Sequence, residues 1–270
     1  DLSAAGGSIS LGAGDAVSLA IRGEGALNAP GGTVAASAGD LDIDAAAVSG
    51  AGDFAAGASN DIFIIENITK ADGGISLDAG RDVVFTTPPG TFDLTVEASF
   101  IELTAGRSIR DAALLGTSLV STSGDIALTA SGGSVDVASL ETLTPGSNIS
   151  WTQRDSLFLR LSGPNGVLAT PGTENVAVTL TGAGSVLTFG GDFGGLGPGA
   201  TVQEASSLDA TAPTVRLWDS LDIAGGATLL ATSGDVIFGT PTDPGFLAGP
   251  ATNLTIQAAD SSASSAGPFR

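Results

Sequence analysis

The chain has 270 residues, of which 29 are acidic and only 9 are basic, so its formal net charge is −20. Binding to nucleic acid or to an anionic membrane surface needs clustered Lys and Arg, and this charge balance argues against both partners. Cys and His are absent, which excludes disulfides, thiolate metal sites and His-dependent catalysis.

The apolar residues indicate a thin interior rather than a globular core. Hydrophobic residues make up 42% of the chain but aromatic residues only 5%, so most apolar positions are Ala, Val, Leu and Ile. No apolar run approaches the ~20 residues that a membrane-spanning helix needs. The given chain starts at Asp1 and does not begin with a basic-then-apolar segment, so we expect a processed form or a segment of a longer protein.

Short segments of alternating apolar and polar residues follow one another along the whole chain. This alternation is typical of half-buried strands. We predict strands at residues 8–11, 17–19, 41–43, 75–77, 135–137, 176–180 and 254–256. Only 112–119 resembles a helix, and it is too short to count as one. The sequence therefore predicts an all-β protein.

Segments rich in Pro and Gly interrupt this pattern. Proline cannot donate a hydrogen bond to a strand ladder, so we interpret 87–90, 190–199 and 241–245 as loops. None of them is long or polar enough to link two domains. We therefore expect a single β-solenoid domain at 1–260, followed by a flexible tail of linker composition at 261–270.

One phrase recurs eight times: a turn residue, then Asp, then alternating apolar positions. The first four copies are 25, 21 and 21 residues apart, a spacing in the range of solenoid repeats. We therefore predict a parallel β-helix with roughly 20 or more residues in each turn. The eight aspartates are Asp15, Asp40, Asp61, Asp82, Asp125, Asp155, Asp219 and Asp235.

Two interpretations of these aspartates are open. A carboxylate at a turn accepts hydrogen bonds from backbone N–H groups two residues further on, which would make all eight residues structural corner caps. Carboxylates stacked one turn apart would repel one another, so they could instead bind a ladder of Ca²⁺ ions. The calcium-binding repeat Gly-Gly-x-Gly-x-Asp occurs nowhere in the chain. We favour corner caps and expect no cofactor.

The densest acidic cluster is Asp40, Asp42 and Asp44, which alternate with Leu41 and Ile43. On a strand the three carboxylates share one face, about 7 Å apart. They could bind a hard cation, or supply an acid/base pair for glycoside cleavage. Such a strand is more often a solvated face above a buried one. We favour the solvated face and keep the three aspartates as candidate metal ligands.

Two further residue types have both a structural and a functional interpretation. Trp151 and Trp218 are the only tryptophans, and they could fill the corners of a solenoid or offer stacking surfaces to a sugar. We favour filling. Asn67, Asn148 and Asn253 fit the N-glycan acceptor pattern and also fit ladders of strand-end Asn.

Catalysis in this chain would require Asp pairs, or Asp together with Arg. The eligible arginines are Arg107, Arg110, Arg154 and Arg160, and the sequence places none of them beside paired carboxylates and aromatic sugar platforms. We therefore expect no catalytic residues. Because parallel β-helices also occur as polysaccharide lyases and hydrolases, that activity stays an alternative based on fold-level analogy.

The repeat units resemble those of filamentous haemagglutinin-type adhesins, which are large secreted β-helical proteins of Gram-negative bacteria. Units such as 74–83 and 123–130 carry the resemblance, which covers most of residues 5–260. The segment 163–167 is similar to the Asn-Pro-Asn-Gly element of that family's secretion domain. It lies mid-chain and lacks the first Asn, so that role does not transfer.

The resemblance implies export, a right-handed β-helical rod, and adhesion or fibre building at the bacterial cell surface. We therefore expect a non-catalytic segment whose long face of Ser, Thr and Asp makes weak, repeated contacts. The expected partners are a host or neighbouring-cell surface, a glycan or matrix. The main alternative is a subunit that joins end to end into a filament, because open solenoid ends expose unpaired strand edges.

Overall fold

The chain forms two compact units, Asp1–Ala138 and Ser139–Arg270, which we call unit 1 and unit 2 and describe separately. The structure is a computed structural model. It describes residues 2–3, 8–14, 18–21, 27–28, 32–43, 51–70, 72–86, 94–112, 116–137, 139–160, 173–190, 200–202, 207–217, 221–223, 226–238, 247–248 and 254–258.

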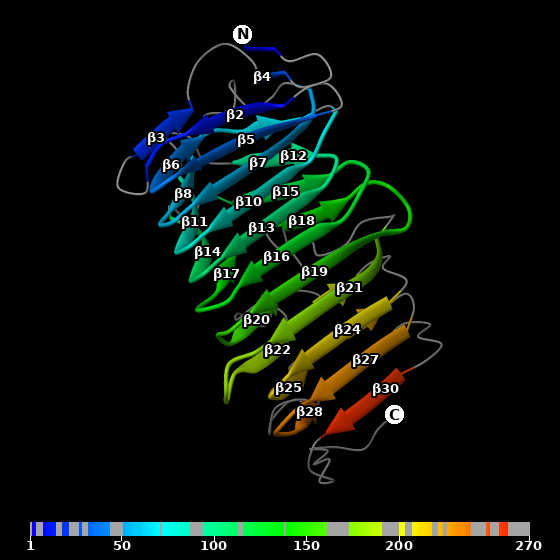
Figure 1. The fold of residues 1–270 in the computed structure, drawn as a ribbon. Helices are drawn as coiled ribbons and strands as arrows, with labels where there is room; N and C mark the ends of the chain where they lie inside the picture. Colours follow the sequence, from blue (N-terminus) through cyan, green and yellow to red (C-terminus); the bar gives the residue numbers. More distant parts are fainter. Residues whose placement is uncertain are drawn as a thin grey trace. The chain divides into compact units, whose positions relative to one another are not determined.

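The first sheet of unit 1, which we call the broad sheet, takes one strand from each successive turn of the chain (Figure 1). Neighbouring strands are parallel, and each pairs with the equivalent strand of the next turn. Its strands are β2 (Ile9–Gly12), β5 (Thr33–Ala38), β7 (Asp53–Ala58), β10 (Ile75–Ala79), β13 (Ile101–Ala105) and β16 (Ile126–Ala130).

Two further parallel sheets complete the turns of unit 1. The corner sheet contains β3 (Ser18–Ile21), β6 (Asp40–Ile43), β8 (Ile62–Ile64), β11 (Asp82–Phe85), β14 (Ser108–Asp111) and β17 (Val135–Asp136). The third sheet of this unit contains β9 (Ile68–Thr69), β12 (Thr95–Ala98) and β15 (Ser118–Ser121). A short pair, β1 (Leu2–Ser3) with β4 (Leu27–Asn28), is also parallel.

Unit 2 repeats this plan. Its broad sheet contains β19 (Ser147–Gln153), β21 (Thr173–Leu180), β24 (Ser207–Ala212), β27 (Gly226–Ala231) and β30 (Leu254–Ala258). Its second sheet contains β20 (Leu157–Arg160), β22 (Val186–Gly190), β25 (Thr214–Leu217) and β28 (Val236–Phe238). The third contains β23 (Ala200–Val202), β26 (Leu221–Ile223) and β29 (Leu247–Ala248), and β18 (Ser139–Thr142) precedes them all.

The strand register gives the length of each turn. In unit 1 successive turns are 25, 20, 21, 26 and 25 residues long, measured between the partners Ile9, Val34, Phe54, Ile75, Ile101 and Ile126. In unit 2 they are 27, 32, 19 and 27 residues long, measured between Ile149, Val176, Leu208, Ala227 and Leu254. The predicted turn of roughly 20 residues or more is confirmed.

The predicted fold class is also confirmed: every regular element among the described residues is a strand, and the strands stack in parallel as a β-solenoid. All seven predicted strands are present. The described part of 112–119 contains no helix, and its last two residues begin β15. The prediction of one domain at 1–260 stays a prediction. The predicted loops at 87–90 and 241–245, nearly all of 190–199, and the tail at 261–270 lie outside the described residues.

In the interior, small aliphatic side chains stack on their equivalents in the neighbouring turns. Leu77, Leu103 and Leu128 pair in register on three successive turns, and all three are buried. Two residues further along the same strands, Ala79, Ala105 and Ala130 form a second buried column. Burial of these columns supplies the main stabilisation of each turn.

Candidate functional site

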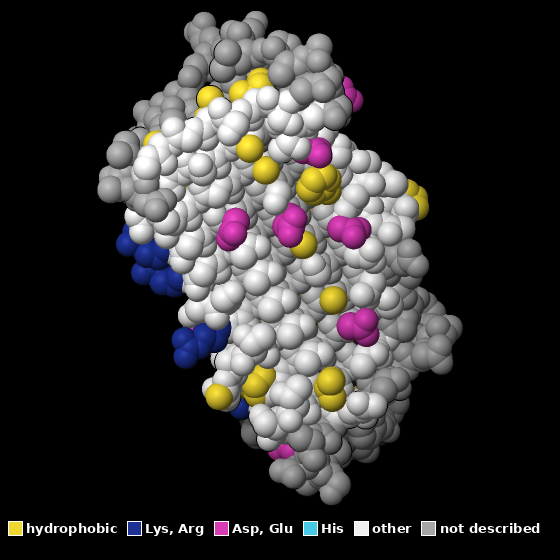
Figure 2. All heavy atoms as spheres, in the orientation of Figure 1, with side chains coloured by type: hydrophobic (Ala, Val, Ile, Leu, Met, Phe, Trp, Pro, Cys, Tyr) yellow, Lys and Arg dark blue, Asp and Glu magenta, His cyan; other side chains and the backbone are white. Residues whose placement is uncertain are grey.

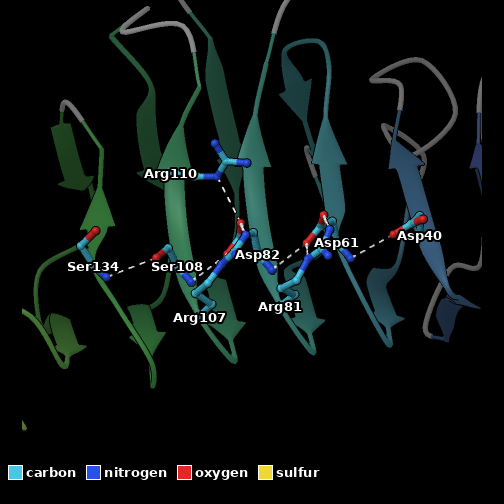
Figure 3. Close-up of polar contacts among 8 residues, drawn as sticks. All are labelled: Asp40, Asp61, Arg81, Asp82, Arg107, Ser108, Arg110 and Ser134. Atoms are coloured by element: carbon cyan, nitrogen blue, oxygen red, sulfur yellow. Dashed lines mark hydrogen bonds and ion pairs between the residues drawn. The ribbon is translucent and has the colours of Figure 1, made fainter.

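The polar side chains with the most regular geometry lie where the strands of the corner sheet begin. Asp40, Asp82 and Ser108 are the first residues of β6, β11 and β14, while Asp61 and Ser134 directly precede β8 and β17. The register aligns these five residues, which we call the corner column. Figure 3 shows them on adjacent strands, each pointing along the row toward the next.

The first four side chains of the corner column each accept a hydrogen bond from a backbone N–H of the next turn. The N–H of Asp61 donates to Asp40 Oδ1 at 3.3 Å, and the N–H of Asp82 donates to Asp61 Oδ1 at 3.1 Å. The N–H of Ser108 donates to Asp82 Oδ1 at 3.1 Å, and that of Ser134 donates to Ser108 Oγ at 3.4 Å. At a corner the side-chain oxygen thus satisfies a backbone donor that enters the strand.

The same arrangement occurs at other strand starts. Ser8 Oγ accepts from Thr33 N at 3.4 Å, and Asp53 Oδ1 accepts from Gly74 N at 2.8 Å. In the third sheet Asn67 Oδ1 accepts from Thr95 N at 2.8 Å, and in unit 2 Ser156 Oγ accepts from Val186 N at 3.0 Å. The strand-end interpretation of Asn67 is therefore confirmed. A polar residue at the start of a strand is a general device of this fold.

Two arginines bind carboxylates of the corner column, as Figure 3 shows. Arg81 Nε donates to Asp61 Oδ1 at 2.8 Å while its Nη2 donates to Asp61 Oδ2. Arg107 binds Asp82 in the same bidentate way, with a 2.8 Å bond from Nε to Oδ1. Arg110 adds a third guanidinium, whose Nε donates to Asp82 Oδ2 at 3.2 Å. The chain's own arginines thus occupy the place where a stack of carboxylates would attract a metal cation.

These contacts fix the protonation of the buried carboxylates. Hydrogen bonding to Arg81 lowers the pKa of Asp61 below its ordinary value; burial opposes this effect, and the N–H of Asp82 adds to it. Hydrogen bonding to Arg107 lowers the pKa of Asp82 in the same way. Both carboxylates are therefore ionised at neutral pH, which suits a structural ion pair and does not suit a general acid.

The eight predicted corner aspartates do not form one row. Asp40, Asp61 and Asp82 do, but Asp125 lies in front of β16 of the broad sheet, where its carbonyl accepts from Ile101 N at 3.0 Å. In unit 2 Asp155 and Asp235 precede β20 and β28 at registers that differ by one residue. The remaining two, Asp15 and Asp219, lie outside the described residues.

The predicted mechanism of capping needs a correction. We expected each carboxylate to accept from an N–H two residues further on, whereas Asp40 and Asp61 accept from the residue 21 positions on. The reason is that the chain returns to the same corner after one full turn, and this places the equivalent backbone N–H directly beside the carboxylate. These aspartates therefore link turns rather than close a local bend.

The acidic cluster on β6 has the predicted alternation. Leu41 and Ile43 are fully buried, whereas Asp40 and Asp42 are half-buried on the outward face. Asp44 lies outside the described residues. Within the part of the chain that the structure describes, no group of three or more acidic residues is placed to bind a metal ion.

Sequence reasoning missed the role of the arginines. Arg107 and Arg110 lie three residues apart in the chain, and both reach back one turn to Asp82. A signal was present, because the residue before the corner position is Arg in two successive turns, at Arg81 and Arg107. The partner could not be read from it, since the two ion pairs span 20 and 25 residues.

One carboxyl has the opposite electrostatic character. Burial, with a smaller effect from Asp111, raises the pKa of Asp136 above its ordinary value. Asp136 pairs in register with Arg110, on the outward face of the corner sheet. Asp111 faces inward and accepts hydrogen bonds from Gly116 N and from the backbone and side chain of Thr117. Asp136 is therefore a carboxyl at which an acid/base reaction would be tested.

Trp151 is buried in unit 2, as the filling interpretation predicts. Its Nε1 donates to Gln153 Oε1 at 2.8 Å, and Gln153 Nε2 donates in turn to the carbonyls of Asp155 and Ser156. The indole is therefore part of the interior and offers no stacking surface. Trp218 lies outside the described residues.

The outward face of each broad sheet carries short polar side chains in register. In unit 1 Thr104 pairs with Thr129, and Ser76 pairs with Glu102 and donates to it at 3.4 Å. In unit 2 Thr152, Thr179 and Thr211 form one row. We call this surface the hydroxyl face, and Figure 2 shows it as a largely uncharged field with scattered acidic groups.

The fold and its corner ladder define a parallel β-solenoid repeat protein. Comparisons of the chain with protein-family models, with curated proteins and with solved structures found no match. The described residues include no helix long and apolar enough to cross a bilayer.

Proposed function

We propose that this chain is a segment of an extracellular bacterial adhesin or surface fibre, without catalytic activity, and that its hydroxyl face makes weak, repeated contacts with a glycan or matrix. The observation that carries the proposal is the register of the short polar side chains. Thr104 and Thr129 present the same group on two successive turns, about 4.8 Å apart. A surface with this period suits a partner that is itself repetitive, because each added turn adds one similar contact.

The proposal is tested by blocking the hydroxyl face and measuring binding to immobilised glycans and matrix proteins. The variant Thr104→Arg/Thr129→Arg puts long cationic side chains on the face, and we expect binding to fall about tenfold or more. Thr69→Arg is the matched control, because Thr69 is exposed on β9 of the third sheet. Equal binding by the two variants would exclude the hydroxyl face as the contact surface.

An end-to-end filament is the alternative, and one observation favours it. β2 is the terminal strand of the broad sheet of unit 1, so within the described residues one of its edges has no strand beside it. A free parallel edge is a template for a further strand. Negative-stain microscopy of the purified chain decides between the two functions: long single rods support the filament, and short separate particles support the adhesin segment.

The absence of catalysis is tested separately. The purified chain is incubated with acidic polysaccharides, and the release of reducing or unsaturated sugar ends is measured. We expect none. Release that is lost in Asp136→Asn or Asp42→Asn would establish a polysaccharide-processing enzyme instead.

A further inference from the structure

An aromatic side chain is held on the outward face of the broad sheet of unit 1. Phe100 directly precedes β13, is half-buried, and lies on the same face as Glu102, two residues further on. Its ring covers Gly74, the register equivalent in the turn before, because a Cβ at Gly74 would overlap the ring atoms Cδ1, Cε1 and Cζ. An overlap with three consecutive ring atoms puts the glycine under a face of the ring rather than at its edge.

Three exposed carboxylates surround this ring. The strand register puts Asp53, Gly74, Phe100 and Asp125 in one row on four successive turns. Asp53 therefore lies one turn from the glycine under the ring, and Asp125 one turn from Phe100 itself, about 4.8 Å away in each case. Glu102 lies about 7 Å further along β13 on the same face. All three carboxylates are exposed.

The basic side chains of unit 1 lie elsewhere among its described residues. Lys70 is buried, and the other three bind the corner aspartates; they are Arg81, Arg107 and Arg110. Arg81 and Arg107 follow β10 and β13, whereas Phe100 lies at the opposite end of its strand. Figure 2 shows the acidic groups on the face in view and the basic groups along one edge of it.

The three carboxylates are not equally available to a ligand. Asp53 Oδ1 accepts a hydrogen bond from Gly74 N at 2.8 Å. Burial lowers the pKa of Lys70 and Asp53 acts in the opposite direction, so Asp53 also faces a buried amine. Asp125 and Glu102 are therefore the two carboxylates that we assign to a site around the ring.

These groups together favour a ligand with three properties. The face of an aromatic ring attracts a cation and also packs against apolar surface. Carboxylates attract a cation and accept hydrogen bonds from hydroxyl groups. Ser76, whose hydroxyl donates to Glu102 at 3.4 Å, adds a hydroxyl next to the site. A sugar ring with an amine has an apolar face, hydroxyl groups and a positive charge, whereas a lysine side chain has no hydroxyl groups.

We propose that Phe100, Asp125 and Glu102 form a binding site for a sugar ring that carries a protonated amine. The proposal rests on the function proposed above, because it names the kind of glycan that this face of the broad sheet contacts. The apolar face of the sugar lies on the aromatic ring, and its ammonium group lies beside a carboxylate. The same carboxylates repel glycans that carry uronic acid or sulfate groups.

The test is an NMR titration of the isotope-labelled full chain with the soluble trisaccharide of glucosamine. A slightly acidic buffer keeps the sugar amine protonated. We expect the largest chemical-shift changes at the amides of Phe100, Glu102 and Asp125. The N-acetylated trisaccharide has the same sugar rings without the charge, and we expect it to bind about threefold more weakly or worse.

Two variants separate the ring from the carboxylates. Phe100→Leu keeps an apolar cover over Gly74 but removes the aromatic face, and we expect affinity for the glucosamine trisaccharide to fall about threefold or more. Phe63→Leu is the matched control, because Phe63 is half-buried on the outward face of β8 in the corner sheet. Asp125→Asn/Glu102→Gln should abolish the preference for the charged sugar. Its matched control, Asp78→Asn/Glu97→Gln, removes two charges elsewhere and should keep that preference.

Three results would overturn the proposal: equal affinity for the two trisaccharides, unchanged affinity in Phe100→Leu, or a lysine tripeptide that binds as tightly and weakens in the same variants. The last result would assign the site to a basic peptide. The function proposed above has its own test, with variants of Thr104 and Thr129 on immobilised glycans and matrix proteins. A chain that fails here and passes there binds its partner without this site, and failure of both tests overturns both proposals.

Discussion

Asp82 is a fully buried anion in a protein that has few cations, and it contacts two of them. Removing a carboxylate from water is costly unless hydrogen bonds replace its hydration. Asp82 accepts bonds from Arg107, Arg110 and the N–H of Ser108, so both of its oxygens are satisfied. Its charge is thus retained by local structure, and the same structure ties one turn to the next.

Replacing Asp82 tests this role at the level of a single charge. Asp82→Asn keeps an oxygen for Ser108 N but loses the charged partner of both arginines, and we expect a loss of roughly 1–3 kcal/mol in unfolding free energy at neutral pH. The folded pKa lies below 3.8, so the stabilisation by this carboxylate is complete above about pH 4 and is lost as the pH falls through the folded pKa.

The measurement is urea unfolding of both proteins at neutral and at acid pH. The two unfolding curves should approach each other in acid, because Asp82 of the unchanged chain is then protonated and loses the charge that Asp82→Asn lacks at every pH. Asp78→Asn is the control, since Asp78 is exposed on β10, and it should leave stability within about 0.5 kcal/mol. A difference between Asp82→Asn and the unchanged chain that stays constant with pH would show that the charge contributes nothing.

Lys70 gives a second prediction at this scale. It is the only lysine in the sequence, it is 1% exposed, and burial lowers its pKa, with Asp53 acting in the opposite direction. We expect Lys70 to resist an amine-reactive reagent in the folded protein and to react fully in urea, as followed by peptide mass spectrometry. The α-amino group serves as the internal control. Rapid labelling of Lys70 under native conditions would contradict its burial.

At the scale of the element, the corner between the broad sheet and the corner sheet requires glycine. A Cβ at Gly80 would lie 2.2 Å from the carbonyl oxygen of Ser59, and one at Gly106 would lie 2.1 Å from that of Gly80. Successive turns approach each other there through backbone alone. The Ala-Gly corners of the sequence thus reflect close stacking of one turn on the next.

The substitution Gly106→Ala tests this stacking. The nearest atom is backbone and cannot swing away, so we expect a loss of about 1–3 kcal/mol in unfolding free energy, as for other overpacked sites. Gly57→Ala is the matched control, because a Cβ in β7 would have its nearest contact at 3.9 Å, an ordinary distance. Chemical denaturation of both variants gives the comparison, and equal stabilities would contradict the stacking account.

The sequence predicts the strands, the length of a turn and part of the corner column. It does not predict the whole column, for reasons that particular residues show. Asp40, Asp61 and Asp82 are 21 residues apart, so equal turn lengths make their alignment visible. The next turn of unit 1 is longer and has Ser108 in place of Asp at its corner, so the spacing of aspartates in the sequence does not reveal that the column continues. Asp125 belongs to the same sequence motif but lies at a different corner. A turn residue followed by alternating apolar positions is found at the start of any strand, so the motif does not identify the sheet to which the strand belongs.

At the scale of the whole molecule, a solenoid is stabilised mainly by contacts between neighbouring turns. Each inner turn of unit 1 pairs with the turn before it and the turn after it, and the buried columns continue from one to the next. The effect of a core substitution should therefore extend to adjacent turns and fade beyond them.

Double substitutions measure this range. Leu77 and Leu103 are register partners in β10 and β13, so Leu77→Ala and Leu103→Ala, each costing about 2–5 kcal/mol, should combine non-additively by roughly 0.5–3 kcal/mol. Leu229, equally buried in β27 of unit 2, supplies the control, and Leu77→Ala with Leu229→Ala should be additive. Calorimetry or urea unfolding gives the energies, and additivity in both pairs would argue against coupling between turns.

The strand-start hydrogen bonds also give the solenoid a polarity. In the eight hydrogen bonds described above, the side-chain oxygen belongs to the earlier turn and the N–H group to the later one. The bond from Gly73 N to Ser99 Oγ has the opposite order, with the donor in the earlier turn. A chain that emerges N-terminus first therefore finds a completed row of acceptors before each new turn forms. Growth from the C-terminal end would place each of these eight donors before its acceptor exists. We therefore expect folding to proceed from the N-terminal turn onward, and refolding traces of unit 1 pulled from either end would reveal that direction.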